Sequence, residues 1–388
     1  MFFFTTILSL TLASGFYLFG QFVVNLLKLN KIISKVSNPV YQYILIGISF
    51  FLFITFPSFF LLHYERLLFQ VISYLFIFIG ILNFYINYNV QKKLFLKFIS
   101  IFRARNYYYI FIFIYLLFYF LYSLAPISSA DTVAYHAPVA QFIIENGKFP
   151  SNVYEFSSLL SGSGEFLNAF AISINANQFT SFIHFSGLVS FIGVILSFSK
   201  KNNLNFENRV ILILLILSCP VLIFLIGSSK PQFFFVCCII LSCALLINVK
   251  SLKSEEDKIK SFFFSMLLCI ICVQARISFI ISFFLITIGY IFFNKKIILN
   301  LKFLFLSIVI TSFSLIPHYF WKQSVFNYSF YNFFFNPLPL NIPGVYEFSL
   351  VAKDWGSNYF PLSLFFPTSL SLVTFNLGIG LFIFFFFL

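Results

Sequence analysis

Charged residues are scarce in this chain of 388 residues: only 9% are Asp, Glu, Lys or Arg, whereas 61% are hydrophobic. So little charge excludes a soluble globular protein, because a soluble surface carries far more. Apolar runs of about 20 residues, the length needed to cross a bilayer, recur along the whole sequence. The composition therefore predicts a single membrane domain over residues 1–388.

Several further features are lacking. The apolar start, Met1–Leu27, has no basic head and no clear small-residue cleavage site, so we expect a first span rather than a cleavable signal. No cysteine lies in an expected outer loop, which excludes a disulfide framework there. The pair Cys269-Ile-Ile-Cys272 has the spacing of a metal or redox site, but without a second pair it indicates buried small residues. The chain also lacks internal repeats and phosphate-binding glycine motifs.

The hydrophobic pattern predicts about eleven transmembrane helices. Of the 24 Lys and Arg residues, all but six fall in one set of alternate loops, which the positive-inside rule makes cytoplasmic. The six on the other side are Arg66, Lys148, Lys230, Arg276, Lys322 and Lys353. The expected spans are residues 3–27, 41–62, 67–87, 108–125, 182–198, 210–226, 232–248, 261–275, 277–293, 303–318 and 368–388.

The net charge of +13 follows from this bias together with contact between the basic loops and anionic lipid. A nucleic-acid partner is not needed to explain it. Two long segments, 126–181 and 319–367, lie on the outer side, where long loops in a compact membrane domain tend to be functional. The multi-pass chain is therefore expected in a plasma membrane, with its functional face outward.

The first outer segment opens with Asp131-Thr-Val-Ala-Tyr135-His136-Ala-Pro138. Pro138 predicts a turn over 131–137 and a short helix from Pro138 to about Asn146, ended by Gly147. Its apolar face, with Val139, Phe142 and Ile143, is expected on the membrane interface. This arrangement brings Asp131, Tyr135 and His136 to the mouth of the bundle. The alternative is that Asp131 caps a helix and Tyr135 anchors it at the interface.

Three other outer features carry charge. A Gly/Ser turn leads into a short helix that begins near Glu165, and a helix N-terminus favours an anion. Lys230 lies in the short turn Gly227-Ser-Ser-Lys230-Pro-Gln, and Arg276 lies in a tight hairpin; both could bind a phosphate. The alternatives are a plain flexible turn and side chains that snorkel to the interface. Residues 319–367, with Asn336-Pro-Leu-Pro339, are expected as an outer cap with a partly re-entrant packing loop.

These residues resemble the GT-C superfamily of integral-membrane glycosyltransferases, and most closely the bacterial relatives of the protein mannosyltransferase and aminoarabinose-transferase group. Asp131-x-x-x-Tyr135-His136 matches the first outer loop of that superfamily. The Glu165 turn, the Lys230 turn, the Arg276 hairpin and the Asn336-Pro-Leu-Pro339 loop follow in the same order. The resemblance covers about residues 105–388; residues 1–104 supply N-terminal spans outside it. Many members carry two neighbouring acids where this chain has Asp131-Thr132.

The resemblance implies an all-α bundle with short interfacial helices in its outer loops. It also implies transfer of a sugar from a polyprenyl-phosphate donor to a glycan, lipid or protein acceptor, with inversion. Asp131 would be the general base. Tyr135, His136 and Glu165 would bind substrate, and Arg276 with Lys230 would stabilise the leaving phosphate. No metal ligands are assigned, and a divalent cation is left open.

Two other classes fit the composition less well. A polymerase or ligase of lipid-linked polysaccharide also has long outer loops, but usually without an acid heading the first one. A lipid or polysaccharide flippase would favour charged or Gly/Pro-broken spans and internal repeats. The chain stops inside an apolar run that ends at Leu388, so we expect either a blunt last span or a longer natural protein.

Overall fold

The computed structural model describes residues 2–62, 64–88, 107–126, 128–129, 131–293, 301–335 and 341–352. Within these ranges the chain is helical and has no β-strand, which confirms the all-α class. The first half contains α1 (Phe2–Leu26), α2 (Asn30–Ile33), η1 (Pro39–Tyr41), α3 (Tyr43–Leu61), α4 (Arg66–Ile86), α6 (Tyr107–Ser123), η2 (Thr132–His136), α7 (Ala137–Asn146), α8 (Phe156–Leu160), α9 (Ser163–Ser173) and α10 (Phe179–Lys201).

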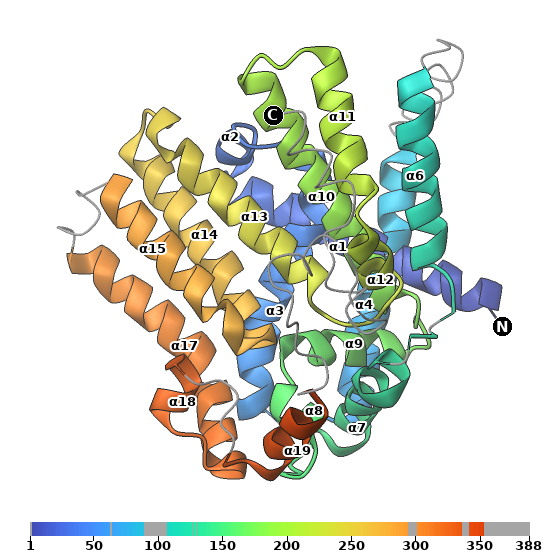
Figure 1. Ribbon diagram of the computed structural model, residues 1–388, viewed down its shortest axis with the longest axis vertical. Coiled ribbons are helices and arrows are strands. Elements are labelled where there is room, and N and C mark those ends of the chain that lie inside the picture. The colour runs from blue at the N-terminus through green and yellow to red at the C-terminus, as the bar shows by residue number, and fades with distance from the viewer. Residues whose placement is uncertain are drawn as a thin grey trace.

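The second half continues the same bundle (Figure 1). Long helices on one side of the picture run roughly side by side, and the short helices α7, α8, α9, α18 and α19 gather at one end. The remaining helices are α11 (Phe206–Leu217), α12 (Pro220–Ile226), α13 (Phe233–Asn248), η3 (Val249–Ser251), α14 (Glu255–Ala275), η4 (Ile277–Phe279), α15 (Ile280–Phe293), α17 (Leu301–Phe326), α18 (Phe330–Phe335) and α19 (Pro343–Ala352).

Six helices of the described chain are long and apolar enough to cross a membrane. They are α1, α3, α4, α10, α14 and the run Phe233–Ser251. Ile110–Ser123 and Ile277–Phe293 are shorter apolar helices. The expected last span, 368–388, lies outside the described residues. With six helices of spanning length among its described residues, the molecule has the make-up of a membrane protein.

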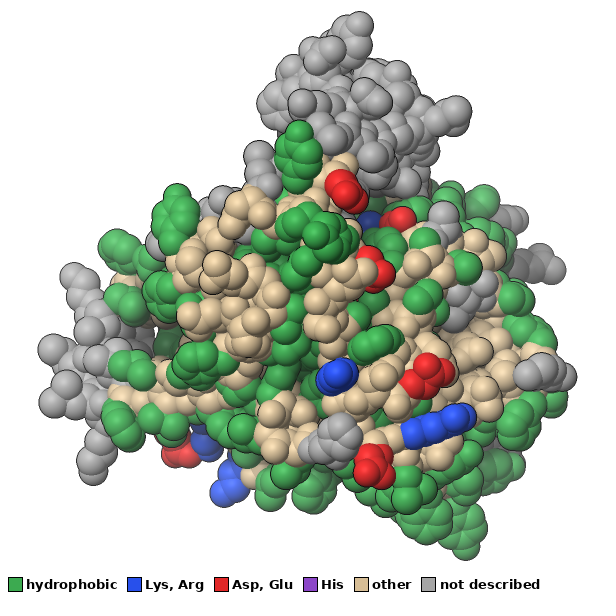
Figure 2. Space-filling model, turned by 90° about the horizontal axis from the view of Figure 1, so that it is seen from below, with side chains coloured by type: hydrophobic (Ala, Val, Ile, Leu, Met, Phe, Trp, Pro, Cys, Tyr) green, Lys and Arg blue, Asp and Glu red, His purple; other side chains and the backbone are tan. Residues whose placement is uncertain are grey.

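Loops that were expected on one side of the membrane do meet at one end of the bundle. Lys31, after α1, forms an ion pair of 2.6 Å with Asp257 at the start of α14. The short helices lie at the opposite end, where charged side chains are scattered among hydrophobic ones (Figure 2). Two of the loops expected to be cytoplasmic therefore meet at the end of the bundle opposite the short helices.

Three local expectations were wrong. Residues 131–137 do not form the expected non-helical turn: Thr132–His136 form the π-helix η2, which runs directly into α7, and Ala137 is helical with φ −72° and ψ −44°. A widened turn tolerates Pro138, which would disrupt regular helical hydrogen bonding. The expected span 210–226 is divided at Pro220 into α11 and α12. Residues 319–326 are not loop but the last turns of α17.

Helix α7 ends at Gly147 with φ 61°, as expected. Its apolar face does not lie on the membrane interface: Val139 and Ile143 are buried and α7 packs against α9. Helix α9 is itself enclosed, and the Phe166 ring lies 5.7 Å from Phe56 of α3 and 5.8 Å from Phe69 of α4, measured between centroids. The first outer segment therefore packs against one end of the bundle instead of lying on the membrane interface.

Candidate active site

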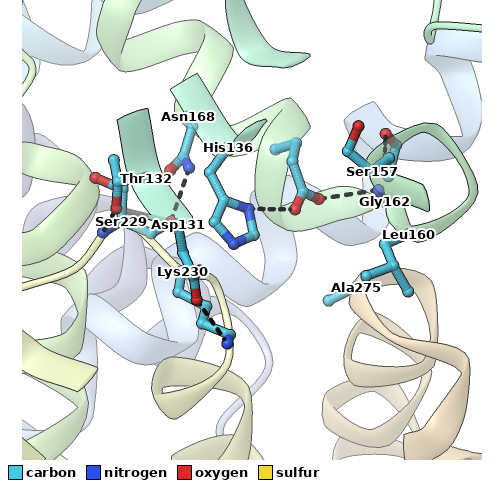
Figure 3. Close-up of polar contacts among 12 residues, drawn as sticks. Asp131, Thr132, His136, Ser157, Leu160, Gly162, Asn168, Ser229, Lys230 and Ala275 are labelled. Carbon is cyan, nitrogen blue, oxygen red and sulfur yellow. Dashed lines mark hydrogen bonds and ion pairs between the residues drawn. The ribbon is translucent and has the colours of Figure 1, made fainter. Parts of the chain in front are cut away.

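Asp131 stands at the start of η2 with its side chain 37% exposed. It makes no helix-capping hydrogen bond. Its Oδ2 atom instead lies 3.0 Å from Lys230 Nζ, which comes from the turn between α12 and α13 (Figure 3). The capping alternative for Asp131 is therefore wrong, and the structure brings Asp131 and Lys230, two of the candidate site residues, into direct contact.

Thr132 and Ser229, the neighbours of that ion pair, hold it in place. The backbone N–H of Ser229 donates to Thr132 Oγ1 at 2.9 Å, and Thr132 is fully buried. The carbonyl of Ser229 accepts from Asn168 Nδ2 of α9 at 3.2 Å, and its hydroxyl bonds to Thr180 of α10. One short turn is thereby fixed to η2, α9 and α10. Thr132, at the position after the acid, serves this positioning.

Glu165 is the centre of a second, buried group. Its Oε1 accepts from Arg276 Nη2 at 2.9 Å and contacts His136 Nδ1 at 2.8 Å. Its Oε2 accepts the backbone N–H of Gly162 at 3.0 Å, so the carboxylate caps its own helix. The exposed fractions are 2% for Glu165, 8% for Arg276 and 0% for His136. The Glu165 carboxylate itself is therefore the anion at the N-terminus of α9.

The Gly/Ser turn before α9 owes its composition to close packing. A Cβ atom on Gly162 would lie 2.3 Å from the carbonyl oxygen of Gln274, and one on Gly164 would lie 2.2 Å from Pro231 Cβ. The end of α14 and the start of α13 therefore approach the backbone of α9 directly. Only glycine permits this approach, which brings Arg276 within reach of Glu165.

The charges in this region set the protonation states. Burial alone would raise the pKa of Glu165, but the Arg276 charge and the His136 hydrogen bond outweigh it and lower the pKa to about 2. Burial lowers the pKa of His136, despite its bond to Glu165. At neutral pH a carboxylate therefore accepts from a neutral imidazole, whose Nε2 atom has no hydrogen-bond partner among the described residues.

Tyr135 connects the two groups. Its ring centroid lies 4.1 Å from that of His136. Burial raises the pKa of Tyr135 to about 12, and the charges of Asp131, Arg276 and Glu165 also act on its hydroxyl. The six predicted residues thus occupy one neighbourhood, arranged as an Asp131–Lys230 pair and a buried His136–Glu165–Arg276 group. The terminal nitrogens of Arg276 bond to Glu165 and to the Leu160 carbonyl, so they are not free for the leaving phosphate, and its Nε atom has no partner among the described residues.

Sequence reasoning missed Lys322 and His318, which α17 brings beside Arg276. Both are buried, and with Arg276 they line a cavity of about 100 Å³. The sequence signal was Lys322 itself, one of six expected outer cations, in the segment 319–367 that was expected to form an outer cap with a packing loop. The expected Asn336-Pro-Leu-Pro339 loop lies outside the described residues.

All six cysteines are free thiols, and Cys269 and Cys272 are buried. Across the described part of the chain, no three His, Cys, Asp or Glu side chains are grouped as metal ligands. No curated protein and no solved structure matches the chain. A family pattern, the DUF1420 N-terminal domain, matches residues 81–388. This match takes in every candidate site residue, and the chain therefore belongs to the DUF1420 N-terminal domain family.

Proposed function

We propose that this chain is a multi-pass membrane glycosyltransferase that uses a polyprenyl-phosphate sugar as donor. The observation that carries the proposal is the Asp131–Lys230 pair: a one-third exposed carboxylate held at 3.0 Å from an ammonium group at one end of an apolar bundle. The order of the charged outer segments, which resembles the GT-C superfamily, supports the same reaction class. The acceptor is a glycan, lipid or protein hydroxyl.

In the proposed reaction Asp131 takes the proton from the acceptor hydroxyl as that oxygen bonds to the anomeric carbon of the sugar. The bond from the anomeric carbon to the phosphate oxygen breaks, and the phosphate leaves with the bonding electron pair. A single displacement of this kind inverts the anomeric centre. Lys230 orients the carboxylate and stabilises the negative charge on the leaving phosphate.

The buried His136–Glu165–Arg276 group supports the Asp131–Lys230 pair by fixing neighbouring side chains. Glu165 orients His136, whose ring lies against that of Tyr135 on η2 at an interplanar angle of 44°. Fixing these rotamers holds the helix turn that carries Asp131, which is the kind of support that a positioned general base requires. Tyr135, which is partly exposed, contacts the sugar or the phosphate, whereas the fully buried His136, expected from the sequence to bind substrate, has a positioning role instead.

The proposed topology has about eleven spans, with the Asp131 end on the outer face of a bacterial plasma membrane. A lipid-borne donor suits that face, because nucleotide sugars are confined to the cytoplasm. The bias of Lys and Arg toward the Lys31–Asp257 end supports this orientation. The polyprenyl tail would lie between helices in the lipid.

Asp131→Asn tests the proposal, with Glu145→Gln as the matched control on an exposed acid of the neighbouring helix α7. Membranes containing each variant would be incubated with a polyprenyl-phosphate sugar. We expect Asp131→Asn to lose roughly 10²–10⁴-fold in transfer rate, with unchanged membrane insertion, and Glu145→Gln to keep its activity. Full activity in Asp131→Asn would refute the assigned base.

Cells lacking the protein provide the second readout. Their lipid extracts should accumulate a sugar-charged isoprenoid phosphate, which identifies the donor sugar. Accumulation of a larger lipid-linked oligosaccharide instead would favour a polymerase or ligase.

A further inference from the structure

The cavity beside Arg276 lies between three elements that are distant in sequence. It is lined by residues 159–161 at the end of α8, residues 275–278 after α14, and His318 and Lys322 of α17. Its volume is about 100 Å³. One water molecule needs roughly 10–15 Å³ by this kind of measure, so the cavity has room for a group of several heavy atoms.

Lys322 is the most unusual side chain in its wall. It is 3% exposed and, among the described residues, forms no ion pair with a carboxylate. Its Nζ atom donates to the carbonyl of Leu159 and lies 5.9 Å from the ring centroids of Trp321 and Tyr328. A carbonyl and two aromatic rings compensate a buried ammonium only in part, because such a charge normally requires an anion.

Two more nitrogen groups at this wall lack partners. His318 is 1% exposed, and neither of its ring nitrogens has a hydrogen-bond partner within the described ranges. The Nε atom of Arg276 is also buried without a partner there. Buried polar atoms are nearly always satisfied, so a set of orphaned nitrogens around one cavity indicates a missing ligand.

The charges around the cavity indicate the sign of that ligand. Glu165 pairs with Arg276 and so balances one cation, and no carboxylate among the described residues pairs with Lys322. Burial and the Arg276 charge lower the pKa of Lys322 to about 7, so an anion in the cavity would favour its ammonium form. The unused atoms are an ammonium, a guanidinium N–H and imidazole nitrogens, which come from two separate elements. A phosphate group carries at least three unbridged or terminal oxygens in a tetrahedral arrangement when it is a monoester or a free ion, so each of the three groups can donate to a separate oxygen.

We propose that this cavity is an oxyanion site that binds a phosphate group through Lys322, His318 and Arg276. The site is separate from the Asp131–Lys230 pair and does not depend on sugar transfer. The phosphate belongs either to a lipid headgroup or to a free phosphate ion, since both present the same oxygens to the cavity.

Calorimetric titration of the full chain in detergent tests the site. The probes are inorganic phosphate and a short-chain prenyl monophosphate, each against chloride at equal ionic strength. The variants are Lys322→Met and, as a control with the same charge change, Lys148→Met at an exposed position. We expect Lys322→Met to weaken phosphate binding by roughly tenfold or more, and Lys148→Met to bind as the wild type does.

Binding of inorganic phosphate with this variant pattern supports a site for the free ion. Binding of the prenyl phosphate alone, with the same pattern, supports a lipid headgroup. The proposal is wrong if the wild type binds neither probe, or if Lys322→Met binds as tightly as the wild type. If Lys322→Met does not fold, Lys322→Gln takes its place as the test variant, because glutamine still has a donor for the Leu159 carbonyl. Because the readout is binding, a failed transfer assay would not count against this site.

Discussion

Arg276 and Glu165 form an ion pair of 2.9 Å between Arg276 Nη2 and Glu165 Oε1, although one follows α14 and the other lies in α9. Both side chains are almost fully buried. The second terminal nitrogen of Arg276 donates to the carbonyl of Leu160. This pair joins the first outer segment to the hairpin after α14, and so fixes the wall between the candidate active site and the Lys322 cavity.

Glu165→Gln should strongly destabilise the fold. The substitution keeps the shape of the side chain but leaves Arg276 buried without a counter-charge, which costs about 3–5 kcal/mol. The free energy of unfolding in detergent would measure this loss. Glu155→Gln, at an exposed acid in the same outer segment, should change it by less than about 0.5 kcal/mol. Equal effects of the two substitutions would mean that the buried pair contributes nothing specific.

Acid should remove the stability that the Glu165–Arg276 ion pair contributes. Because the folded-state pKa of Glu165 is lowered from 4.5 to about 2, its contribution is fully present above pH 4.5 and is lost as the pH falls toward 2. Unfolding curves of the wild type between pH 5 and 2 should show this loss, and those of Glu165→Gln should lack it. The prediction fails if both proteins lose stability in parallel over that interval.

Thr132→Val should impair the Asp131–Lys230 pair without touching either charge. Valine has the same shape but cannot accept the Ser229 N–H, so the buried donor is left unsatisfied at a cost of about 1–3 kcal/mol. We expect sugar transfer to fall in this variant and to recover in Thr132→Ser, which keeps the hydroxyl.

Ser73→Ala controls for a general loss of stability, because it removes one buried hydrogen bond, to the Phe170 carbonyl at 2.8 Å, elsewhere in the bundle. Transfer that falls equally in Ser73→Ala and Thr132→Val would show that Thr132 has only a structural role.

Single cysteines should report the orientation of the bundle. Asn152→Cys lies on the exposed part of the first outer segment, and Lys253→Cys lies before α14 at the other end. A membrane-impermeant maleimide should label the first in intact right-side-out cells and the second only after permeabilisation, with the wild type as the blank. Labelling of Lys253→Cys in intact cells would reverse the proposed topology.

Much of the architecture was predictable because hydrophobic run length is a local property. The all-α class, the helix that ends at Gly147 and the helix that begins near Glu165 follow from apolar runs and capping residues. The π-helical turn η2 was not predictable, since the rule for residues before proline is a statistical preference that tertiary packing overrides here. The burial of the α7 face was likewise decided by α9, a partner that the local pattern does not reveal.

The sequence by itself determined that the chain is helical and apolar, where its basic loops lie, and which polar residues stand out, because composition and spacing carry those properties directly. Only the tertiary structure decided the pairings: Lys230 with Asp131, Arg276 with Glu165, and Lys322 beside His318. Such partners come from helices far apart in the chain, and their choice depends on how the helices pack, which no local pattern specifies.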